Sequence, residues 1–530
     1  MNRAREILLG ENIIVCDGAM GTMLHSLGVS LSQSFDELNI SRPDVVSSIH
    51  QAYVDAGANV IETNTFGANR LKLQGYGLSS RVRDINLAGA RIARECAGTR
   101  ALVAGSVGPT GKLLHPFGLL SFDEAYEAFR EQIAALCEGG VDLLIIETIQ
   151  DLREIKAAFL AARSVTEIPV ICQMSFAQEG RTMMGTDPGT AAVVLEGMRP
   201  TLIGTNCGTG PQDMLDAVRT MFGVSGIGIT AQPNAGLPRF HEGRVLYLST
   251  PEYMAGFARQ FVEAGAVLVG GCCGTTPDHT KALAAVVAGM KRVARTQTDT
   301  VRFAGRSRVV EFGGERPILI GNRLCGAVDG KLSLVQDEVD AQTTRGAEAV
   351  CVNCDAGDTA GKLIEIAQTS GDVALCLSGS DADAVEKALR MVEGRALVRC
   401  GAPDVLPVAA RHGAVVAVDA LGDTPEARLA SAREALEQAR KHGLGKVDVV
   451  INPGSPFTES GAPNDGTLGA IRLIRSELGL STFVEYGSND PRGDAAVIAL
   501  KASAEAGVGA IVCDPTSSEI GALDLARPQE

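Results

Sequence analysis

Residues 263–277 read Glu-Ala-Gly-Ala-Val-Leu-Val-Gly-Gly-Cys-Cys-Gly-Thr-Thr-Pro. The stretch predicts the end of a helix, a glycine, and a short apolar run typical of a buried parallel strand. The run ends in two glycines and two cysteines, and the Gly-Thr-Thr-Pro turn that follows is typical of the start of another helix. A helix, a buried strand and a second helix in close succession indicate the repeating unit of a parallel α/β sheet.

The adjacent Cys272 and Cys273 suggest a metal site. Successive side chains of a regular strand point to opposite faces, so the two sulfurs converge only if the flanking glycines allow unusual backbone angles. Two converging thiolates are soft ligands that favour zinc. The best candidate for a third ligand is Cys207, which follows another short apolar run and lies within residues 204–208 (Gly-Thr-Asn-Cys-Gly). The alternative interpretation is that these cysteines are small buried apolar residues.

The unit of helix, glycine and strand recurs along the 530 residues of the chain. Further copies lie at residues 55–64, 138–148, 345–353 and 505–514. The first half contains eight strand candidates, near residues 13–16, 59–62, 101–106, 143–147, 169–175, 201–206, 227–232 and 266–270. Eight such units predict a (β/α)8 barrel, and a doubly wound open sheet is the alternative.

The second half predicts another eight strands, near residues 317–322, 348–354, 373–378, 395–400, 414–419, 447–452, 481–486 and 509–513. Between the two sets, residues 290–312 interrupt the pattern with basic and polar residues. The predicted fold class is therefore α/β, with two tandem (β/α)8 TIM barrels at residues 1–292 and 313–530 and a linker at residues 293–312.

Composition excludes several classes of protein. The net charge of −15 and the sparse aromatic residues argue against nucleic acid or an anionic membrane as a partner. No apolar run reaches a membrane-spanning length, and the N-terminus lacks the apolar core of a signal peptide. The 13 cysteines are better explained as reduced thiols and ligands than as disulfides, which predicts a cytoplasmic protein.

Barrel enzymes carry their chemistry on the loops that follow the strands, where the first barrel has a ring of polar residues. Each residue alone is more often a capping or hydrogen-bonding group, but together they place carboxylates opposite thiolates. Such a rim suits a small zwitterionic substrate that also carries a metal-binding atom. Its members are Asp17, Thr22, Glu62, Thr63, Asn64, Ser106, Glu147, Thr148, Gln173, Ser175, Asn206, Cys207, Gln232, Asn234, Cys272 and Cys273.

Four stretches together resemble the homocysteine-binding domain of cobalamin-dependent methionine synthase. They are residues 17–22 (Asp-Gly-Ala-Met-Gly-Thr), 62–69 (Glu-Thr-Asn-Thr-Phe-Gly-Ala-Asn), 206–208 (Asn-Cys-Gly) and 270–277 (Gly-Gly-Cys-Cys-Gly-Thr-Thr-Pro). The resemblance covers about the first 290 residues. In that family the three matching cysteines bind zinc, and the sulfur of homocysteine takes the fourth position.

The resemblance implies a zinc-dependent homocysteine S-methyltransferase that forms methionine. Zinc would hold the substrate sulfur as a thiolate, the nucleophilic form. Asn234 would either fill the vacant metal position or orient the substrate. Glu62 and Glu147 would receive the ammonium group, and backbone amides at Gly18 to Met20 the carboxylate. The full set of expected substrate-binding residues is Asp17, Gly18, Ala19, Met20, Glu62, Thr63, Ser106 and Glu147.

The second barrel is similar in order and size to the methyltetrahydrofolate-binding domain of the same family, whose fold resembles dihydropteroate synthase. The candidates for contacting a pterin are Asn322, Asn353, Asp355, Asn452 and Asn489. The pocket departs from the family where an aspartate and an asparagine are expected, since this chain has Leu377-Ser378-Gly379-Ser380 and Val398-Arg399-Cys400. The sequence thus predicts an eroded pocket that does not bind methyltetrahydrofolate in the usual way.

Two further features bear on the methyl donor and on metals. The chain contains no Asp-x-His-x-x-Gly stretch typical of a cobalamin domain, so we expect a methyl-corrinoid group on a separate protein. The alternatives are a small methylsulfonium or betaine donor, or a non-catalytic paralogue that binds zinc or homocysteine. Cys351-x-x-Cys354 resembles half of a second metal site, but no matching pair follows, so two buried thiols are expected.

Overall fold

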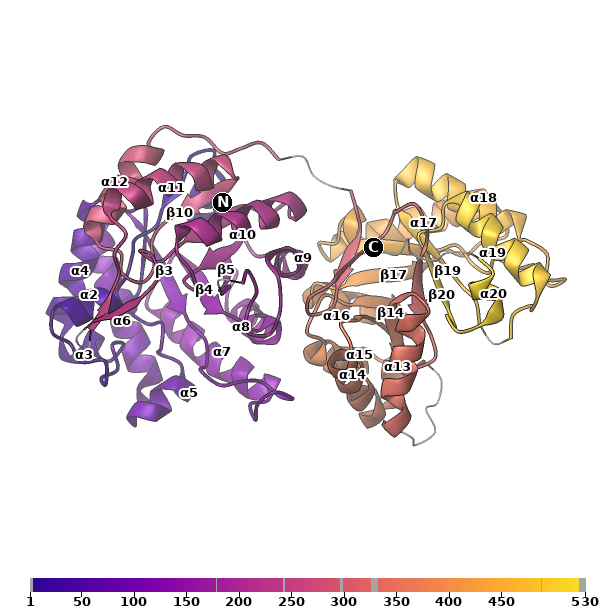
Figure 1. Cartoon of the computed structure of the whole chain (residues 1–530), viewed down its shortest axis with the longest axis horizontal. Coiled ribbons are helices and arrows are strands. Elements are labelled where there is room, and N and C mark those ends of the chain that lie inside the picture. Colours follow the sequence, from indigo (N-terminus) through magenta and orange to yellow (C-terminus); the bar gives the residue numbers. More distant parts are fainter. Residues whose placement is uncertain are drawn as a thin grey trace. The chain divides into compact units, whose positions relative to one another are not determined.

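Parallel strands alternate with helices through both halves of the chain, as the recurring apolar runs predict. The computed structural model describes residues 3–177, 179–241, 244–295, 299–325, 332–487 and 489–523. The chain divides into two compact units, Met1–Gln297 and Thr298–Glu530 (Figure 1).

The first unit is built on eight parallel strands in the order β1-β10-β7-β6-β5-β4-β3-β2. A parallel bridge between Cys16 and Val60 links the two outer strands, so the sheet curls into a nearly closed barrel. The predicted (β/α)8 fold is confirmed, and the doubly wound alternative is wrong. The strands are β1 (Ile14–Val15), β2 (Val60–Glu62), β3 (Leu102–Val107), β4 (Leu143–Ile149), β5 (Val170–Met174), β6 (Leu202–Asn206), β7 (Ile229–Gln232) and β10 (Ala266–Val269).

Helices surround this barrel (Figure 1). α1 (Arg3–Leu9) lies at the amino-terminal end of the strands, where Ala4 and Leu8 are buried with inward-facing core residues. A hairpin of β8 (Arg239–His241) and β9 (Arg244–Leu246) follows β7. The other helices are α2 (Gly21–Ser26), α3 (Leu38–Ser41), α4 (Pro43–Asp55), α5 (Arg70–Leu73), α6 (Val82–Ala97), α7 (Phe122–Glu138), α8 (Leu152–Val165), α9 (Pro188–Met198), α10 (Pro211–Val224), α11 (Pro251–Glu263) and α12 (Pro277–Val287).

The second unit is a closed barrel in which eight strands pair in chain order from β13 to β20. The strands are β13 (Ile318–Gly321), β14 (Ala347–Asn353), β15 (Ala374–Gly379), β16 (Leu397–Cys400), β17 (Val415–Asp419), β18 (Val449–Asn452), β19 (Ser481–Glu485) and β20 (Ala510–Cys513). The helices are α13 (Val335–Thr344), α14 (Asp358–Ser370), α15 (Ala382–Met391), α16 (Val405–Arg411), α17 (Pro425–Lys441), α18 (Asp465–Leu473), α19 (Asp494–Ala506) and α20 (Ser518–Gly521). The predicted second (β/α)8 barrel is confirmed.

The expected linker at residues 293–312 is wrong over its second half. β11 (Arg302–Ala304) and β12 (Val309–Glu311) pair antiparallel, and this hairpin belongs to the second unit. Phe303 and Phe312 are buried in one cluster with inward-facing residues of the barrel strands, so the hairpin forms part of the barrel core. The polar composition hid this role, because only alternate residues of the hairpin face the core.

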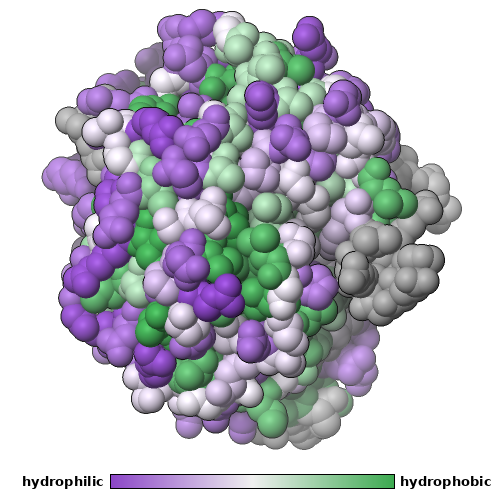
Figure 2. Space-filling view, turned by 90° about the vertical axis from the view of Figure 1, so that its left-hand side faces the viewer, coloured by the Kyte–Doolittle hydropathy of each residue, from purple (hydrophilic) through white to green (hydrophobic). Residues whose placement is uncertain are grey.

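No helix in the described ranges is long and apolar enough to cross a bilayer. On the face of the first unit that Figure 2 shows, hydrophobic residues are interspersed among hydrophilic ones.

Candidate functional site

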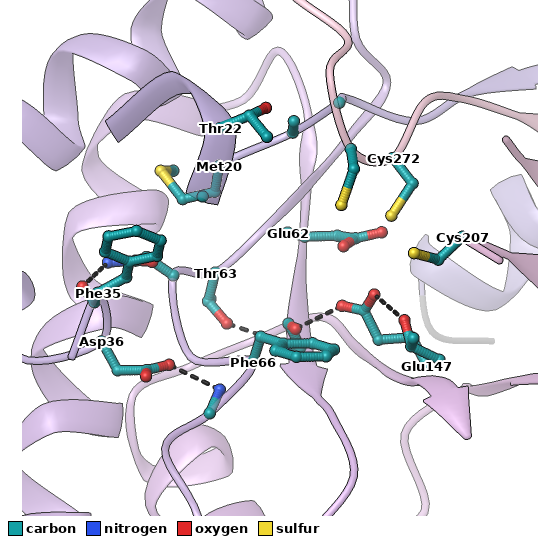
Figure 3. A pocket seen from close by; sticks show the side chains of 18 of the residues that line it. Met20, Thr22, Phe35, Asp36, Glu62, Thr63, Phe66, Glu147, Cys207 and Cys272 are labelled. Atoms are coloured by element: carbon teal, nitrogen blue, oxygen red, sulfur yellow. Dashed lines mark hydrogen bonds between the residues drawn. The ribbon is translucent and has the colours of Figure 1, made fainter. Parts of the chain in front are cut away.

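Three cysteine side chains converge at the carboxyl ends of the first barrel's strands. Cys207 follows β6, and Cys272 and Cys273 follow β10. Their three Sγ atoms all lie within 4.8 Å of one another. Cys207 and Cys272 point toward the same space, with Glu62 and Glu147 beside them (Figure 3). The arrangement brings together the residues that the sequence selected from two distant stretches.

The backbone reaches this geometry differently from the sequence prediction. Cys207 itself adopts a left-handed conformation with φ of 55°, whereas of the glycines around Cys272 and Cys273 only Gly274 does so, with φ of 81°. Gly270 and Gly271 are required by close packing, since a Cβ atom there would lie 2.8 Å from Cys16 Cβ and 2.5 Å from Thr275 Oγ1. The two glycines before the cysteines therefore provide space rather than unusual angles.

Asn234 holds the cysteine cluster together. Its Oδ1 accepts a 3.0 Å hydrogen bond from the backbone N–H of Cys273, and its side chain also hydrogen-bonds Cys207. The N–H of Cys272 donates to the carbonyl of Pro233 at 2.8 Å. Because the carboxamide oxygen is already engaged, the geometry gives Asn234 a positioning role toward the sulfurs.

The cysteine cluster is a set of soft donors. Hydrogen bonds from the thiols of Cys272 and Cys273 lower the pKa of Cys207 to about 3, while the Cys207 sulfur and burial raise the pKa of Cys273 to about 12. Three sulfurs on one side of a cavity fit zinc with its fourth position open, because zinc–sulfur bonds are about 2.3 Å long and tetrahedral.

Buried carboxyl groups lie next to the sulfurs. Asp17 Oδ2 accepts a hydrogen bond from the N–H of Glu62 at 2.9 Å, and Glu62 Oε1 accepts one from Gln232 Nε2 at 2.8 Å. The thiol of Cys16 donates to Glu62 Oε1 at 3.5 Å. The Sγ atom of Cys16 and one carboxylate oxygen each of Asp17 and Glu62 lie within 4.8 Å of one another. Acidic side chains are thus concentrated at the carboxyl ends of β1 and β2.

Glu147 completes the acidic group and is tightly held. Its Oε1 accepts from Ser106 Oγ at 2.6 Å, and its Oε2 accepts from Asn206 Nδ2 at 2.8 Å and from Thr148 Oγ1 at 3.3 Å. Thr63 lines the same cavity, but its hydroxyl bonds Thr65 and accepts from the N–H of Ser106. Thr63 therefore holds Ser106, and Ser106 in turn holds Glu147.

The electrostatics of this acidic group favour a cationic ligand. Burial raises the pKa of Glu62 to about 7 and that of Asp17 to about 8, and burial with the Glu62 charge raises the pKa of Glu147. Among the described residues, no lysine or arginine forms an ion pair with these three carboxyls. Buried carboxyls without a cation inside the protein suit an ammonium group from a ligand.

A cavity of 370 Å³ joins the cysteines to Glu62 and Glu147 and extends beyond them, whereas Asp17 is not part of its lining. Gly18, Ala19 and Met20, which were predicted to contact a carboxylate, line this cavity. The N–H of Ala19, however, already donates to Thr275 Oγ1 at 3.1 Å, so this amide is not available to a ligand.

Several residues of this cavity were not predicted from the sequence. The far end is lined by Phe35, Phe66, Lys72 and Tyr76. Phe66 belongs to the family-like stretch 62–69, whereas Phe35 before it and Lys72 and Tyr76 after it lie in segments without a motif. Tyr247 was also missed: its hydroxyl hydrogen-bonds Cys273, and its ring packs against Gly274. It follows the β8–β9 hairpin, whose approach to the cysteines depends on the tertiary fold.

Four of the five residues expected to bind a pterin in the second barrel form hydrogen bonds within the protein. Asn353 Oδ1 accepts from the N–H of Asp355, whose carboxylate accepts from the N–H groups of Ser380 and Asp381. Asn452 Nδ2 donates to Asp419 at 2.9 Å. Asn322 Nδ2 donates to the carbonyl of Tyr486 at 3.4 Å, and Asn489 is exposed.

An ion pair and several thiols occupy this end of the second barrel. Arg399 on β16 pairs with Glu485 on β19. Cys351 and Cys354 are both buried but belong to different core clusters, so the Cys-x-x-Cys pair does not converge. Cys351 instead pairs in register with Cys376 on the neighbouring strand.

Comparison with known proteins covers most of the chain. Residues 14–287 match the sequence model of a family described as homocysteine S-methyltransferase. A methionine synthase of Mycobacterium tuberculosis (strain ATCC 25618 / H37Rv) is 30% identical over 470 residues, which cover 80% of this chain and 39% of that protein. A methionine synthase of Mycobacterium leprae (strain TN) is 37% identical over 301 residues, 53% of this chain and 25% of that protein.

The chain therefore spans well under half the length of these two relatives. Among solved structures, a homocysteine methyltransferase from Escherichia coli in its oxidized form is 25% identical, with a TM-score of 0.46, and the match covers 54% of this chain and 99% of that one.

Proposed function

Because the chain belongs to the homocysteine S-methyltransferase family, as the motifs of its first half predicted, we propose that its first barrel transfers a methyl group to homocysteine and forms methionine. The observation that carries the proposal is the convergence of three cysteine sulfurs within 4.8 Å, in one cavity with buried carboxyl groups. This cavity offers separate places for a thiol and for an ammonium group.

Cys207, Cys272 and Cys273 would hold zinc, with Asn234 fixing two of them in place. When bound there, zinc supplies an open position that keeps the substrate sulfur as a thiolate at neutral pH. Glu62 and Glu147 would bind the substrate ammonium, since both line the cavity and neither has a cationic partner among the described residues. The thiolate sulfur then donates an electron pair to the methyl carbon as the bond from that carbon to the donor breaks.

We infer that the methyl group arrives on a separate methyl-corrinoid protein. The support is the exposed apolar residues on the loops that follow the strands of the first barrel. Leu119 after β3 is 99% exposed, Met183 after β5 is 77% exposed, and Leu31 after β1 is both 58% exposed and part of the cavity lining. Exposed apolar side chains on the loops that follow the strands, Leu31 among them at the cavity, suit the docking of a protein partner.

A turnover assay with matched variants tests this function. Zinc-loaded protein and homocysteine are mixed with methylcobalamin, with S-methylmethionine as a small sulfonium donor, or with methyltetrahydrofolate, and methionine is measured by mass spectrometry. We expect methionine from methylcobalamin alone. Cys272→Ala should lose both bound zinc and turnover, whereas Cys137→Ala, which changes a cysteine outside the cavity lining, should keep both.

Each contrary outcome of the assay points to a different function. Turnover by Cys272→Ala without metal would refute the zinc mechanism. Methionine from the sulfonium compound would replace the corrinoid donor with a small one. Homocysteine binding without turnover from any of these donors or from a methyl-corrinoid protein would identify a non-catalytic member of the family.

For the second barrel we propose that methyltetrahydrofolate does not bind in the usual way. The Arg399–Glu485 ion pair and the internal bonds of Asn353, Asp355 and Asn452 support this, because a ligand would have to replace them. Calorimetric titration with methyltetrahydrofolate, beside a homocysteine control, tests it. We expect heat of binding from homocysteine and none from methyltetrahydrofolate. Saturable heat from methyltetrahydrofolate would refute the proposal.

A further inference from the structure

The far end of the first barrel's cavity contains a single basic side chain. Lys72 is the only lysine or arginine among the cavity-lining residues that the structure describes. It lies on the short helix α5 (Arg70–Leu73), which follows β2. Its Nζ sits 4.6 Å from the centre of the Phe66 ring, which positions the ammonium by a cation–π contact.

No carboxylate lies at ion-pair distance from this ammonium in the part of the chain that the structure describes, although the negative charges of Asp36, Glu154 and Glu147 raise its pKa against the lowering by burial. The Lys72 side chain forms no hydrogen bond there, and its backbone N–H donates to Asn69 Oδ1. Asp36 lines the same part of the cavity, but its two oxygens accept from the N–H of Gly67 at 2.8 Å and from Ser34 Oγ at 3.3 Å. A half-buried cation with no carboxylate at ion-pair distance favours an anionic group from a ligand.

The cavity is otherwise poor in groups that attract an anion. Its other charged side chains are Asp36, Glu62 and Glu147, and its cysteines carry negative charge when deprotonated. The Ala19 amide, one of the three backbone donors expected to receive a carboxylate, is engaged by Thr275. An amino-acid substrate brings a carboxylate into this acidic surrounding and therefore needs a compensating cation.

We propose that Lys72 binds the α-carboxylate of the amino-acid thiol and so selects substrates that carry one. The inference rests on the proposed function, because it places the thiol at the cysteines and the ammonium at Glu62 and Glu147. The cysteines, the two glutamates and Lys72 then bind the thiol, the ammonium and the carboxylate of one small molecule. A thiol that lacks the carboxylate keeps the first two contacts and loses the third.

Binding experiments with a matched pair of ligands test this role. Lys72→Met removes the charge and keeps an apolar stem against Phe66, while Lys72→Arg keeps the charge. Lys281→Met makes the same change at an exposed lysine on α12 and is the control. The dissociation constants of homocysteine and of 3-mercaptopropylamine, which is homocysteine without its carboxylate, are measured by calorimetry on the zinc-loaded proteins.

We expect wild-type protein to prefer homocysteine over 3-mercaptopropylamine by at least about tenfold, the effect of one charge-assisted hydrogen bond. Lys72→Met should weaken homocysteine binding by about the same factor and leave 3-mercaptopropylamine unchanged. Lys72→Arg should retain most of the preference, and Lys281→Met all of it.

Two results would overturn the role of Lys72 and leave the proposed function intact. The first is equal affinity of the wild-type protein for both thiols. The second is an equal loss of affinity for both thiols in Lys72→Met. Wild-type protein that binds neither thiol would instead contradict the proposed function, and this inference with it.

Discussion

Replacing Glu147 by glutamine removes one negative charge from the proposed ammonium site while keeping the shape of the side chain. The carboxylate is 6% exposed and accepts hydrogen bonds from Ser106, Asn206 and Thr148. The amide has one acceptor oxygen in place of two, so at least one of these donors loses its partner. We expect this to lower the free energy of unfolding by about 1 kcal/mol.

The effect on substrate binding should be larger than the effect on folding. Burial and the charge of Glu62 raise the pKa of Glu147, so a ligand cation beside this carboxyl would stabilise its charged form. A hydrogen bond between two charged groups contributes about 1.5–3 kcal/mol. Since about 1.4 kcal/mol equals a factor of ten, Glu147→Gln should raise the dissociation constant of homocysteine roughly 10- to 150-fold.

Calorimetry with two ligands isolates the ammonium contact. 4-Mercaptobutanoate is homocysteine without its amino group, and its affinity for Glu147→Gln should match or exceed that for the wild-type protein. Glu127→Gln, at an exposed glutamate on α7, is the control and should leave both affinities unchanged. If Glu147→Gln weakens both ligands equally, or leaves homocysteine binding intact, Glu147 does not contact the ammonium.

Two further predictions concern stability. Burial raises the pKa of Glu62 and Glu154 to about 7 and that of Asp17 to about 8, so between about pH 4 and pH 8 the folded protein holds protons that the unfolded chain has released. The free energy of unfolding of the metal-free first unit should therefore fall as pH rises through this range, and Glu154→Gln should make this dependence on pH weaker. Urea titrations at pH 5.5 and 7.5 measure the free energy of unfolding. An increase of this free energy with pH would contradict the reasoning. Phe303→Ala should destabilise the second barrel by about 3–5 kcal/mol, because Phe303 is fully buried against Phe312 in its core, and should leave homocysteine binding unchanged. An unaltered urea midpoint for the second unit would show that the hairpin does not support the barrel.

The sequence predicted both barrels because each strand is buried on both faces. A parallel strand covered by helices requires a continuous apolar run, and such runs are visible without an alignment. Val267, Leu268 and Val269 form one of these runs, and β10 ends where the glycines begin. The hairpin at residues 302–311 escaped the prediction because it contacts the core with alternate residues only.

The cysteine cluster was also within reach of the sequence. In a parallel barrel all carboxyl ends of the strands lie on one side, so Cys207 after β6 and Cys272 after β10 had to face the same rim. Among the 13 cysteines, these three were singled out by the adjacent pair Cys272 and Cys273 between glycines and by the place of Cys207 after another predicted strand.

The tertiary structure alone decided which rim residues a ligand can reach. Thr63 and Ala19 both line the cavity. The Thr63 hydroxyl is hydrogen-bonded to Thr65, however, and the Ala19 amide donates to Thr275. Lys72 and Tyr247 stand on short, irregular segments and gave no periodic signal, yet both adjoin the cavity or its cysteines. Strand order depends on local patterns of burial. Whether a polar group is free to bind a ligand depends on its hydrogen-bond partners, which can lie more than 200 residues away in the sequence, as Thr275 lies from Ala19.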